Sequence, residues 1–160
     1  MIQRLISALL GLLLLSSGYA AESLKISAPW VAQAPPGASV MAGYMHIQNL
    51  TAEPVEITAI HSPAYERVEM HLSLNQNGVA KMLPQKSLKI PARGSLSLEP
   101  GSYHLMMIKP RRALKKGDSV PLSITLSSQQ TLQIQLTVKK KPPAGAGSMK
   151  CGGGKCGGGK

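Results

Sequence analysis

The sequence predicts an all-β protein built as a β-sandwich, and three observations support this fold class. Apolar and polar residues alternate over short segments, which is the pattern of half-buried strands. No stretch keeps the 3.6-residue apolar period of an amphipathic helix. Turn residues recur roughly every 8–12 residues, a spacing typical of sandwiches and barrels. We therefore expect an all-β sandwich or barrel whose apolar strand faces meet a second sheet.

Nine segments carry the strand pattern. The clearest hairpin is "VPLSITLSSQQTLQIQLTV", residues 120–138, in which leucine and isoleucine alternate with polar residues along both arms. "APPGA", residues 34–38, is expected to be a loop, because proline cannot donate to a sheet ladder. The expected strands are Leu24–Ala28, Val40–Gln48, Val55–Ala59, Glu66–Leu74, Gly78–Leu83, Ser95–Leu98, Tyr103–Ile108, Ser119–Leu126 and Gln130–Val138.

Residues 1–20 are expected to be a secretory signal peptide. Arg4 precedes an apolar stretch over residues 5–15, and small residues occupy the minus-three and minus-one positions of a cut before Ala21. The alternative, a membrane anchor, is disfavoured because the apolar run is short for a bilayer span of about 20 residues. No Leu-x-x-Cys lipid-attachment pattern is found. We therefore expect a mature protein in the periplasm, without stable insertion into the membrane.

Residues 139–160 are expected to be a flexible tail rich in lysine, glycine and cysteine, which leaves residues 21–138 as one folded domain. Half of the 16 glycines lie in this tail, which has no apolar periodicity with which to form a core. Six of the 18 basic residues also lie there and one lies in the signal peptide, so the domain has 11 basic against 7 acidic residues. With no Phe, one Trp and four Tyr, the chain lacks the stacking surface of a nucleic-acid-binding protein.

The segment "VEMHLSLNQNGVAKM", residues 68–82, has the pattern of a β-hairpin around the turn formers Asn75–Gly78. It carries His71 on one arm and Met82 at the end of the other. A four-residue loop would place His71 directly opposite Met82, with Cβ atoms about 4.5–5.5 Å apart. A two-residue turn would place Met82 opposite Ser73 instead. In either register, His71 and Met82 lie on one face of the hairpin.

A second histidine–methionine pair lies in "SYHLMMIKP", residues 102–110. His104 and Met106 are two residues apart, so on a strand they share a face about 7 Å apart. The two pairs can converge into a four-ligand site, in which soft thioethers and imidazoles without a carboxylate suit Cu(I) and disfavour Mg²⁺, Ca²⁺ or Mn²⁺. A blue-copper electron-transfer centre needs a core cysteine. That class is excluded because Cys151 and Cys156 both lie in the tail.

The spacing of these residues resembles a known signature. Met70-His71, ten residues, Met82, twenty-one residues and His104-Leu105-Met106 resemble the H(M)-x10-M-x21-H-x-M signature of the PCuAC (DUF461) family of periplasmic copper chaperones. The segments "PWVAQAPPGASVMAGYMHIQN", "SPAYERVEMH" and "GSYHLMMI" are similar to family segments too, and the resemblance covers about residues 26–138. The basic residue that often follows the family's tryptophan is not found in "WVAQAPP".

The resemblance implies a cupredoxin-like or Ig-like, Greek-key β-sandwich with one bound Cu(I). We expect the site to be partly exposed, because an incoming ligand must reach the metal. It implies His71, Met82, His104 and Met106 as ligands, and Met70 as a possible accessory ligand. It also implies a non-enzymatic protein that transfers copper by ligand exchange to the copper site of cytochrome oxidase or to a Sco-like partner. The alternative is a metal-free, secreted Ig-like binding or adhesion module.

Other histidines and methionines are expected to have structural roles. His46 and His61 fall outside the signature, so we expect surface or hydrogen-bonding roles for them. Met41, Met45 and Met107 are expected to be packing residues, and Trp30 an anchor in the core or a loop.

The tail cysteines, Cys151 and Cys156, allow several interpretations. They can form a disulfide in an oxidising compartment, or hold Cu(I) as possible accessory ligands of a secondary site. The tripeptide at Gly154–Cys156 also resembles the Gly-Lys-Cys repeats of bufferin-type copper-binding peptides. The remaining alternative is a basic end without a metal.

Overall fold

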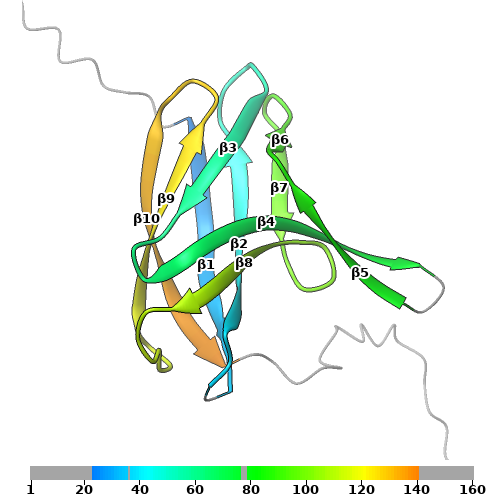
Figure 1. Ribbon diagram of the computed structural model, residues 1–160. Helices are drawn as coiled ribbons and strands as arrows, with labels where there is room; N and C mark the ends of the chain where they lie inside the picture. Colours follow the sequence, from blue (N-terminus) through cyan, green and yellow to red (C-terminus); the bar gives the residue numbers. More distant parts are fainter. Residues whose placement is uncertain (1–22, 36, 77–78, 141–160) are drawn as a thin grey trace, which may run out of the picture.

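The computed structural model describes residues 23–140 except residues 36, 77 and 78. The described residues form ten strands and no helix, which confirms the all-β prediction (Figure 1). No described helix is therefore of a length and hydropathy that would cross a membrane. The predicted signal peptide lies outside the described residues. The strands are β1 (Leu24–Gln33), β2 (Val40–Asn49), β3 (Val55–His61), β4 (Tyr65–Gln76), β5 (Val79–Gln85), β6 (Leu88–Ile90), β7 (Ser95–Leu98), β8 (Tyr103–Pro110), β9 (Ser119–Leu126) and β10 (Thr131–Lys140).

The ten strands form one continuous ladder in the order β5-β4-β8-β7-β2-β1-β10-β9-β3-β6, and β8 also pairs with β2. Most neighbours are antiparallel, whereas β1 with β10 and β7 with β8 are parallel. In Figure 1, β1, β2, β9 and β10 run upright together while β4 and β8 cross in front of them. The sheet thus folds over itself, and its apolar inner surfaces meet.

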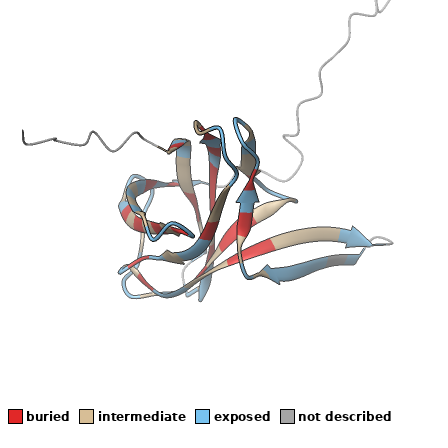
Figure 2. Ribbon diagram, turned by 90° about the horizontal axis from the view of Figure 1, so that it is seen from above, coloured by how far each residue is buried: buried red, intermediate tan, exposed pale blue. Residues whose placement is uncertain are grey.

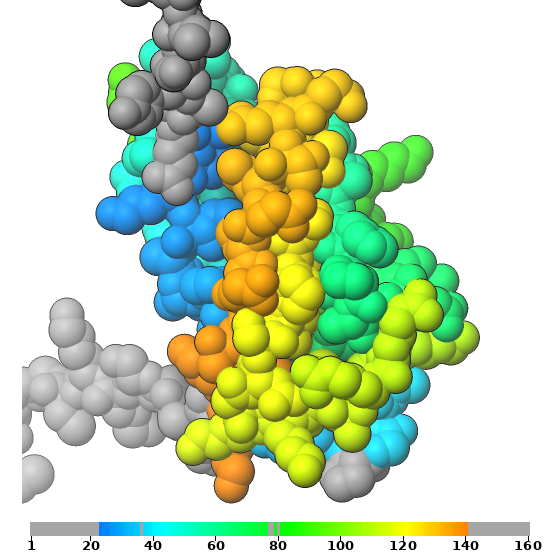
Figure 3. All heavy atoms as spheres, turned by 90° about the vertical axis from the view of Figure 1, so that its left-hand side faces the viewer, coloured from blue at the N-terminus to red at the C-terminus, as the bar shows by residue number. Residues whose placement is uncertain are grey.

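The core fills the space between these two groups of strands. Among the described side chains, every strand except β5 contributes at least one that is buried and apolar, such as Ile47 of β2, Leu105 of β8 and Leu136 of β10. Figure 3 shows the outer side of the β9–β10 layer. On this layer polar side chains pair across the strands, as Ser123 does with Gln133, because alternate residues of a strand face opposite sides.

The hairpin of β4 and β5 projects from this body, as Figure 2 shows. Among the described strands, β5 lies at an edge of the sheet and pairs with β4 alone. Its large apolar side chains are exposed, with Val79 at 60%, Met82 at 56% and Leu83 at 42% exposure. The described side chains of β5 therefore lie outside the core, and the strand is held mainly by its ladder with β4.

All nine predicted strands are present, and most of them are longer than predicted. β1 continues past Pro29 through a bulge, where Ala28 adopts a positive φ of 47° and the register shifts before Trp30. β10 runs to Lys140, which pairs with Gln33. The first two residues of the expected tail thus belong to this strand, and the rest of the tail lies outside the described residues.

β6 was not predicted. It has only three residues and is followed directly by Pro91, so it carries too little alternation to be recognised. Leu88 and Ile90 are nevertheless buried while Lys89 between them is exposed, which is the expected period of two.

Gly43 sets the distance between β2 and the crossing strand β8. A Cβ atom at this position would lie 3.1 Å from Met107 Sδ and 3.3 Å from Leu105 Cβ. Both neighbours belong to β8 and are fully buried. The absence of a side chain at position 43 therefore lets β8 pack closely, and β8 carries two of the predicted ligands.

Candidate metal centre

The β4–β5 hairpin adopts the second of the two registers considered above. Met82 pairs with Ser73, and His71 pairs with Pro84. Since Ser73 lies two residues after His71, the side chains of His71 and Met82 are on the same face of the hairpin. Each is a diagonal neighbour of the other across the ladder.

β8 brings the second pair to this face. His104 pairs directly with His71, and Met106 pairs with Glu69, two residues before His71. The two imidazole rings have their centroids 5.8 Å apart and are tilted by 53°. All four predicted ligands thus lie on one face of the ribbon β5–β4–β8, with the two histidines side by side at its centre.

Exposure differs across this face. His71 and His104 are each only 7% exposed, Met106 is half-buried and Met82 is 56% exposed. The histidine side of the arrangement is therefore shielded from solvent, and the Met82 side is open.

Of the possible accessory ligands, only Met70 is among the described residues, and it lies away from this face. Met70 is buried in the hydrophobic core and pairs with Leu105, on the face of β4 opposite to that of His71. Cys151 and Cys156 lie outside the described residues. Met41, Met45 and Met107 are buried in the core, as predicted from the sequence.

The two histidines outside the signature are on exposed surfaces. His46 Nδ1 lies 3.0 Å from Ser97 Oγ. His61 is an exposed residue at the end of β3. Trp30 packs on Tyr44 with ring centroids 4.7 Å apart, so it acts as an aromatic anchor between β1 and β2.

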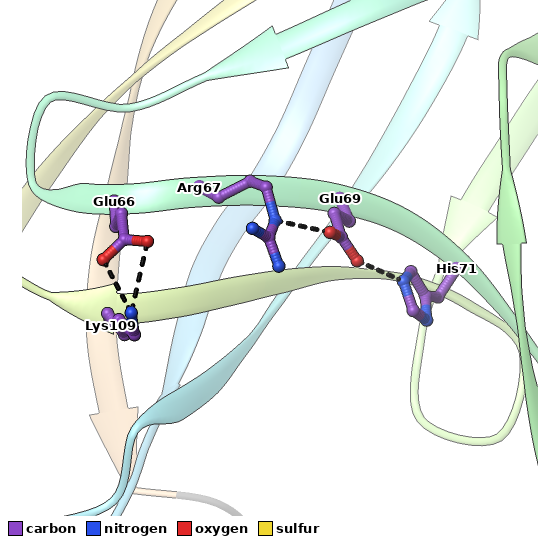
Figure 4. A network of polar contacts seen from close by, with 5 residues as sticks. All are labelled: Glu66, Arg67, Glu69, His71 and Lys109. Carbon is purple, nitrogen blue, oxygen red and sulfur yellow. Dashed lines mark hydrogen bonds and ion pairs between the residues drawn. The ribbon is translucent and has the colours of Figure 1, made fainter.

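A chain of polar contacts leads along β4 to His71 (Figure 4). Arg67 Nε donates to Glu69 Oε1 at 2.5 Å, and His71 Nε2 lies 2.9 Å from Glu69 Oε2. The hydrogen bond from His71 is the largest cause that lowers the pKa of Glu69 below its ordinary value, and the hydrogen bond from Arg67 lowers this pKa further. Because an ionised carboxylate only accepts hydrogen bonds, Nε2 of His71 must carry the proton and donate it.

The other nitrogen of His71 has no partner. Nδ1 is buried, and it is the one buried side-chain nitrogen or oxygen in the described ranges that lacks a hydrogen bond. A buried polar atom without a partner costs about 1–3 kcal/mol, so such an atom calls for a functional explanation. With Nε2 protonated in the neutral ring, Nδ1 presents a lone pair, as a metal ligand must.

His104 shows the complementary arrangement. Its Nδ1 lies 3.2 Å from the carbonyl oxygen of Ser102, which only accepts, so Nδ1 donates and Nε2 is left with the lone pair. Each imidazole therefore has one nitrogen fixed by the protein and one available to a metal. This division is usual for metal-binding histidines, whose second nitrogen is held by a carboxylate or carbonyl.

The donor set fits a soft metal ion. Two imidazoles on one ion have ring centres about 5–6.5 Å apart, since each metal–nitrogen bond is about 2 Å long, and the observed centroid separation of 5.8 Å falls in this range. Across the described part of the chain there is no group of three or more His, Cys, Asp or Glu residues that could hold a metal. A site on this face therefore depends on the thioethers, which favour Cu(I) over harder ions.

Glu69 and Arg67 were not among the residues that the sequence singled out. Their spacing offered a signal, because Arg67, Glu69 and His71 are each two residues apart and so share one face of a strand. Which of the neighbouring charged groups a histidine contacts depends on side-chain conformation, and this is seen only in the structure.

Comparison with known proteins places this chain in a family. A family model described as "Putative lipoprotein LpqE-like" matches residues 24–138. The chain belongs to the LpqE-like family. This finding confirms the PCuAC (DUF461) resemblance seen in the sequence. The LpqE-like chain is 26% identical over 123 residues to "Putative lipoprotein Lxx21020" of Leifsonia xyli subsp. xyli, a match that covers 76% of this chain and 73% of that protein.

Solved structures agree with the family assignment. DR1885 from Deinococcus radiodurans is 28% identical to the LpqE-like chain, and its apo form has a TM-score of 0.60, covering 76% of this chain and 82% of that one. The form described as CuI-DR1885 has a TM-score of 0.58 and covers 78% and 85%. The copper-bound PCuAC domain of PmoF2 has a TM-score of 0.65, covering 77% and 97%. At 17% identity, this last match shows the fold alone.

Proposed function

We propose that this LpqE-like protein is a non-enzymatic copper carrier that binds one Cu(I) through His71, Met82, His104 and Met106. The observation that carries the proposal is the pair of buried, directly opposed imidazoles, each with one nitrogen fixed by the protein and the other available. Two thioethers on the same face supply soft donors. The 28% identical protein whose structure is described as CuI-DR1885 supports copper as the ligand and Cu(I) as its oxidation state.

The gradient of exposure suggests how copper is transferred. Met82 belongs to an edge strand outside the core and is more than half exposed, whereas the histidines are shielded. A donor atom from a partner protein can therefore replace the Met82 sulfur first, while both imidazoles still hold the ion. Transfer then proceeds by stepwise ligand exchange without a change in the oxidation state of copper.

The family and the sequence support a proposal for the partner and for the compartment. We propose a copper-accepting protein, either the copper site of cytochrome oxidase or a Sco-like chaperone, and a location in the periplasm. The lipoprotein description of the relative from Leifsonia supports an exported protein. Cysteine occurs in this chain only at positions 151 and 156, so residues 1–20 offer none for lipid attachment.

A competition titration against a chromophoric Cu(I) chelator tests the function. We expect one Cu(I) per chain in the wild type and loss of this stoichiometry in the double variant His104→Ala with Met106→Ala. His46→Ala is the control, because His46 is exposed on β2 and bonded to Ser97, and it should bind copper like the wild type. A wild type that competes no better than buffer would instead favour the metal-free binding or adhesion module.

A further inference from the structure

The contact between Glu69 and His71 bears on which atom of His71 binds copper. A neutral imidazole carries its proton on either nitrogen, and only the other nitrogen can bind a metal. In an unconstrained histidine both tautomers are available. In this protein, the Glu69 carboxylate accepts from Nε2 at 2.9 Å and the buried Nδ1 has no partner.

Arg67 holds the carboxylate in place. Its guanidinium donates to the other carboxylate oxygen, so Glu69 bridges Arg67 and His71 (Figure 4). Arg67 is largely exposed and Glu69 is about one third exposed, whereas the His71 side chain is 9% exposed. The chain of contacts thus runs from solvent inwards and ends on the buried ring.

The location of Glu69 allows it to act on the site without binding the metal. It pairs with Met106 and lies two residues from His71, so its side chain is on the ligand face. Its two oxygens are already bonded to Arg67 and His71. A carboxylate that orients a metal-binding histidine in this way raises the basicity of the ligand and fixes its ring, and losing such a partner typically costs 10–100-fold in metal affinity.

We infer that Glu69, held by Arg67, is a positioning residue that fixes the proton of His71 on Nε2, so that His71 presents Nδ1 to copper while His104 presents Nε2. This inference rests on the proposed copper function. It adds that the two histidines bind through different nitrogens.

Nitrogen-15 NMR of the imidazole rings tests the inference directly, because Cu(I) is diamagnetic and the spectra distinguish protonated, unprotonated and metal-bound nitrogens. We expect apo wild type, at a pH where the rings are neutral, to show His71 as the Nε2–H tautomer. Addition of Cu(I) should shift Nδ1 of His71 and Nε2 of His104. Glu69→Ala should give a mixture of His71 tautomers and lower the Cu(I) affinity 10–100-fold.

Two further variants separate positioning from charge and from folding. Glu66→Ala removes a carboxylate from the same strand that pairs with Lys109 instead of a histidine, so it should leave tautomer and affinity unchanged. Glu69→Gln keeps an acceptor oxygen and should restore most of the Nε2–H tautomer. Backbone amide spectra establish that each variant is folded.

The results for the inference and for the proposed function are distinguishable. A wild type that does not bind Cu(I) would overturn the proposed function, and with it the copper-bound part of the inference. If the wild type binds copper but His71 binds through Nε2, or if Glu69→Ala behaves like Glu66→Ala in both tautomer and affinity, the copper function stands and the inference is wrong.

Discussion

Gly43→Ala tests whether the packing of β2 against β8 is as close as the structure shows. The added Cβ would lie 3.1 Å from Met107 Sδ, 3.3 Å from Leu105 Cβ and 3.5 Å from Leu136 Cδ2. The Met107 side chain can rotate away, but the Cβ of Leu105 moves only with the backbone of β8. Relief of the crowding therefore requires β8 to shift by a few tenths of an ångström.

The magnitude follows from two opposing terms. Overpacking a well-filled core costs about 1–3 kcal/mol. Replacing glycine by alanine also lowers the entropy of the unfolded chain, which stabilises the fold by about 0.4–1 kcal/mol where the backbone conformation is compatible. We expect a net loss of about 1–2 kcal/mol in the free energy of unfolding, and a fall in Tm of about 4–8 °C.

The assay is urea unfolding followed by circular dichroism and by the fluorescence of Trp30, the single tryptophan. A lower midpoint at an unchanged slope would indicate lost stability without a change in the surface exposed on unfolding. Because Leu105 lies between His104 and Met106, we also expect weaker Cu(I) binding.

Gly117→Ala is the matched control, since Gly117 has a φ of 94° and no atom within 4 Å of an added Cβ. It should lose stability through backbone strain and keep its copper affinity. If Gly43→Ala were as stable as the wild type, β2 and β8 would be farther apart than described, and the argument from close approach would fail.

Four further predictions address the site, the loops and the tail. Met106→Leu should lower the Cu(I) affinity at least about tenfold at unchanged stability, because losing a metal ligand costs no less than losing the hydrogen-bond partner of a ligand. Met107→Leu should keep the Cu(I) affinity and cost less than about 1.5 kcal/mol in the free energy of unfolding. Chelator competition measures the affinity, and urea unfolding measures the stability. Asn49→Ala should destabilise the protein by about 2–3 kcal/mol in urea unfolding, since its buried amide donates to two loop carbonyl oxygens at 2.7 and 2.9 Å. Burial raises the pKa of Tyr65 to about 12 from 10.0. The stability that the neutral Tyr65 phenol contributes is therefore complete below pH 10 and falls as the pH rises to about 12. The free energy of unfolding should fall by at most about 1.4 kcal/mol per pH unit in this range, and Tyr65→Phe should remove this dependence. Truncation after Lys140 should leave the copper stoichiometry at one, and a lower value would assign metal to the tail.

Much of the fold could be predicted because each long strand has a recognisable pattern in its own local sequence. Alternation with a period of two identifies each strand, and it also determines which residues share a face. For this reason His104 and Met106 could be placed together, and His71 and Met82 could be placed on one face before the hairpin register was known. The register itself stayed open, since the turn formers were compatible with loops of two and of four residues.

Other features depend on contacts between distant segments. The sequence contains no local signal that β4 pairs with β8, or that His71 lies opposite His104 in that pairing. The bulge that carries β1 past Pro29 is stabilised by partners on both sides of the strand. The role of Glu69 likewise depends on which oxygen faces which donor, a matter of side-chain conformation rather than of spacing.

The direct pairing of His71 and His104 has a consequence for folding. These residues are 33 positions apart in the chain, yet one ion held by both would cross-link adjacent strands and close the intervening loop. Such a cross-link stabilises a native state mainly by lowering the entropy of the unfolded chain. Copper loading should therefore slow opening of the β4–β8 ladder in hydrogen exchange, and delivery of the ion should restore the faster rate. The protection of backbone amides in these two strands would then report, independently of any spectrum of the metal, whether copper is bound.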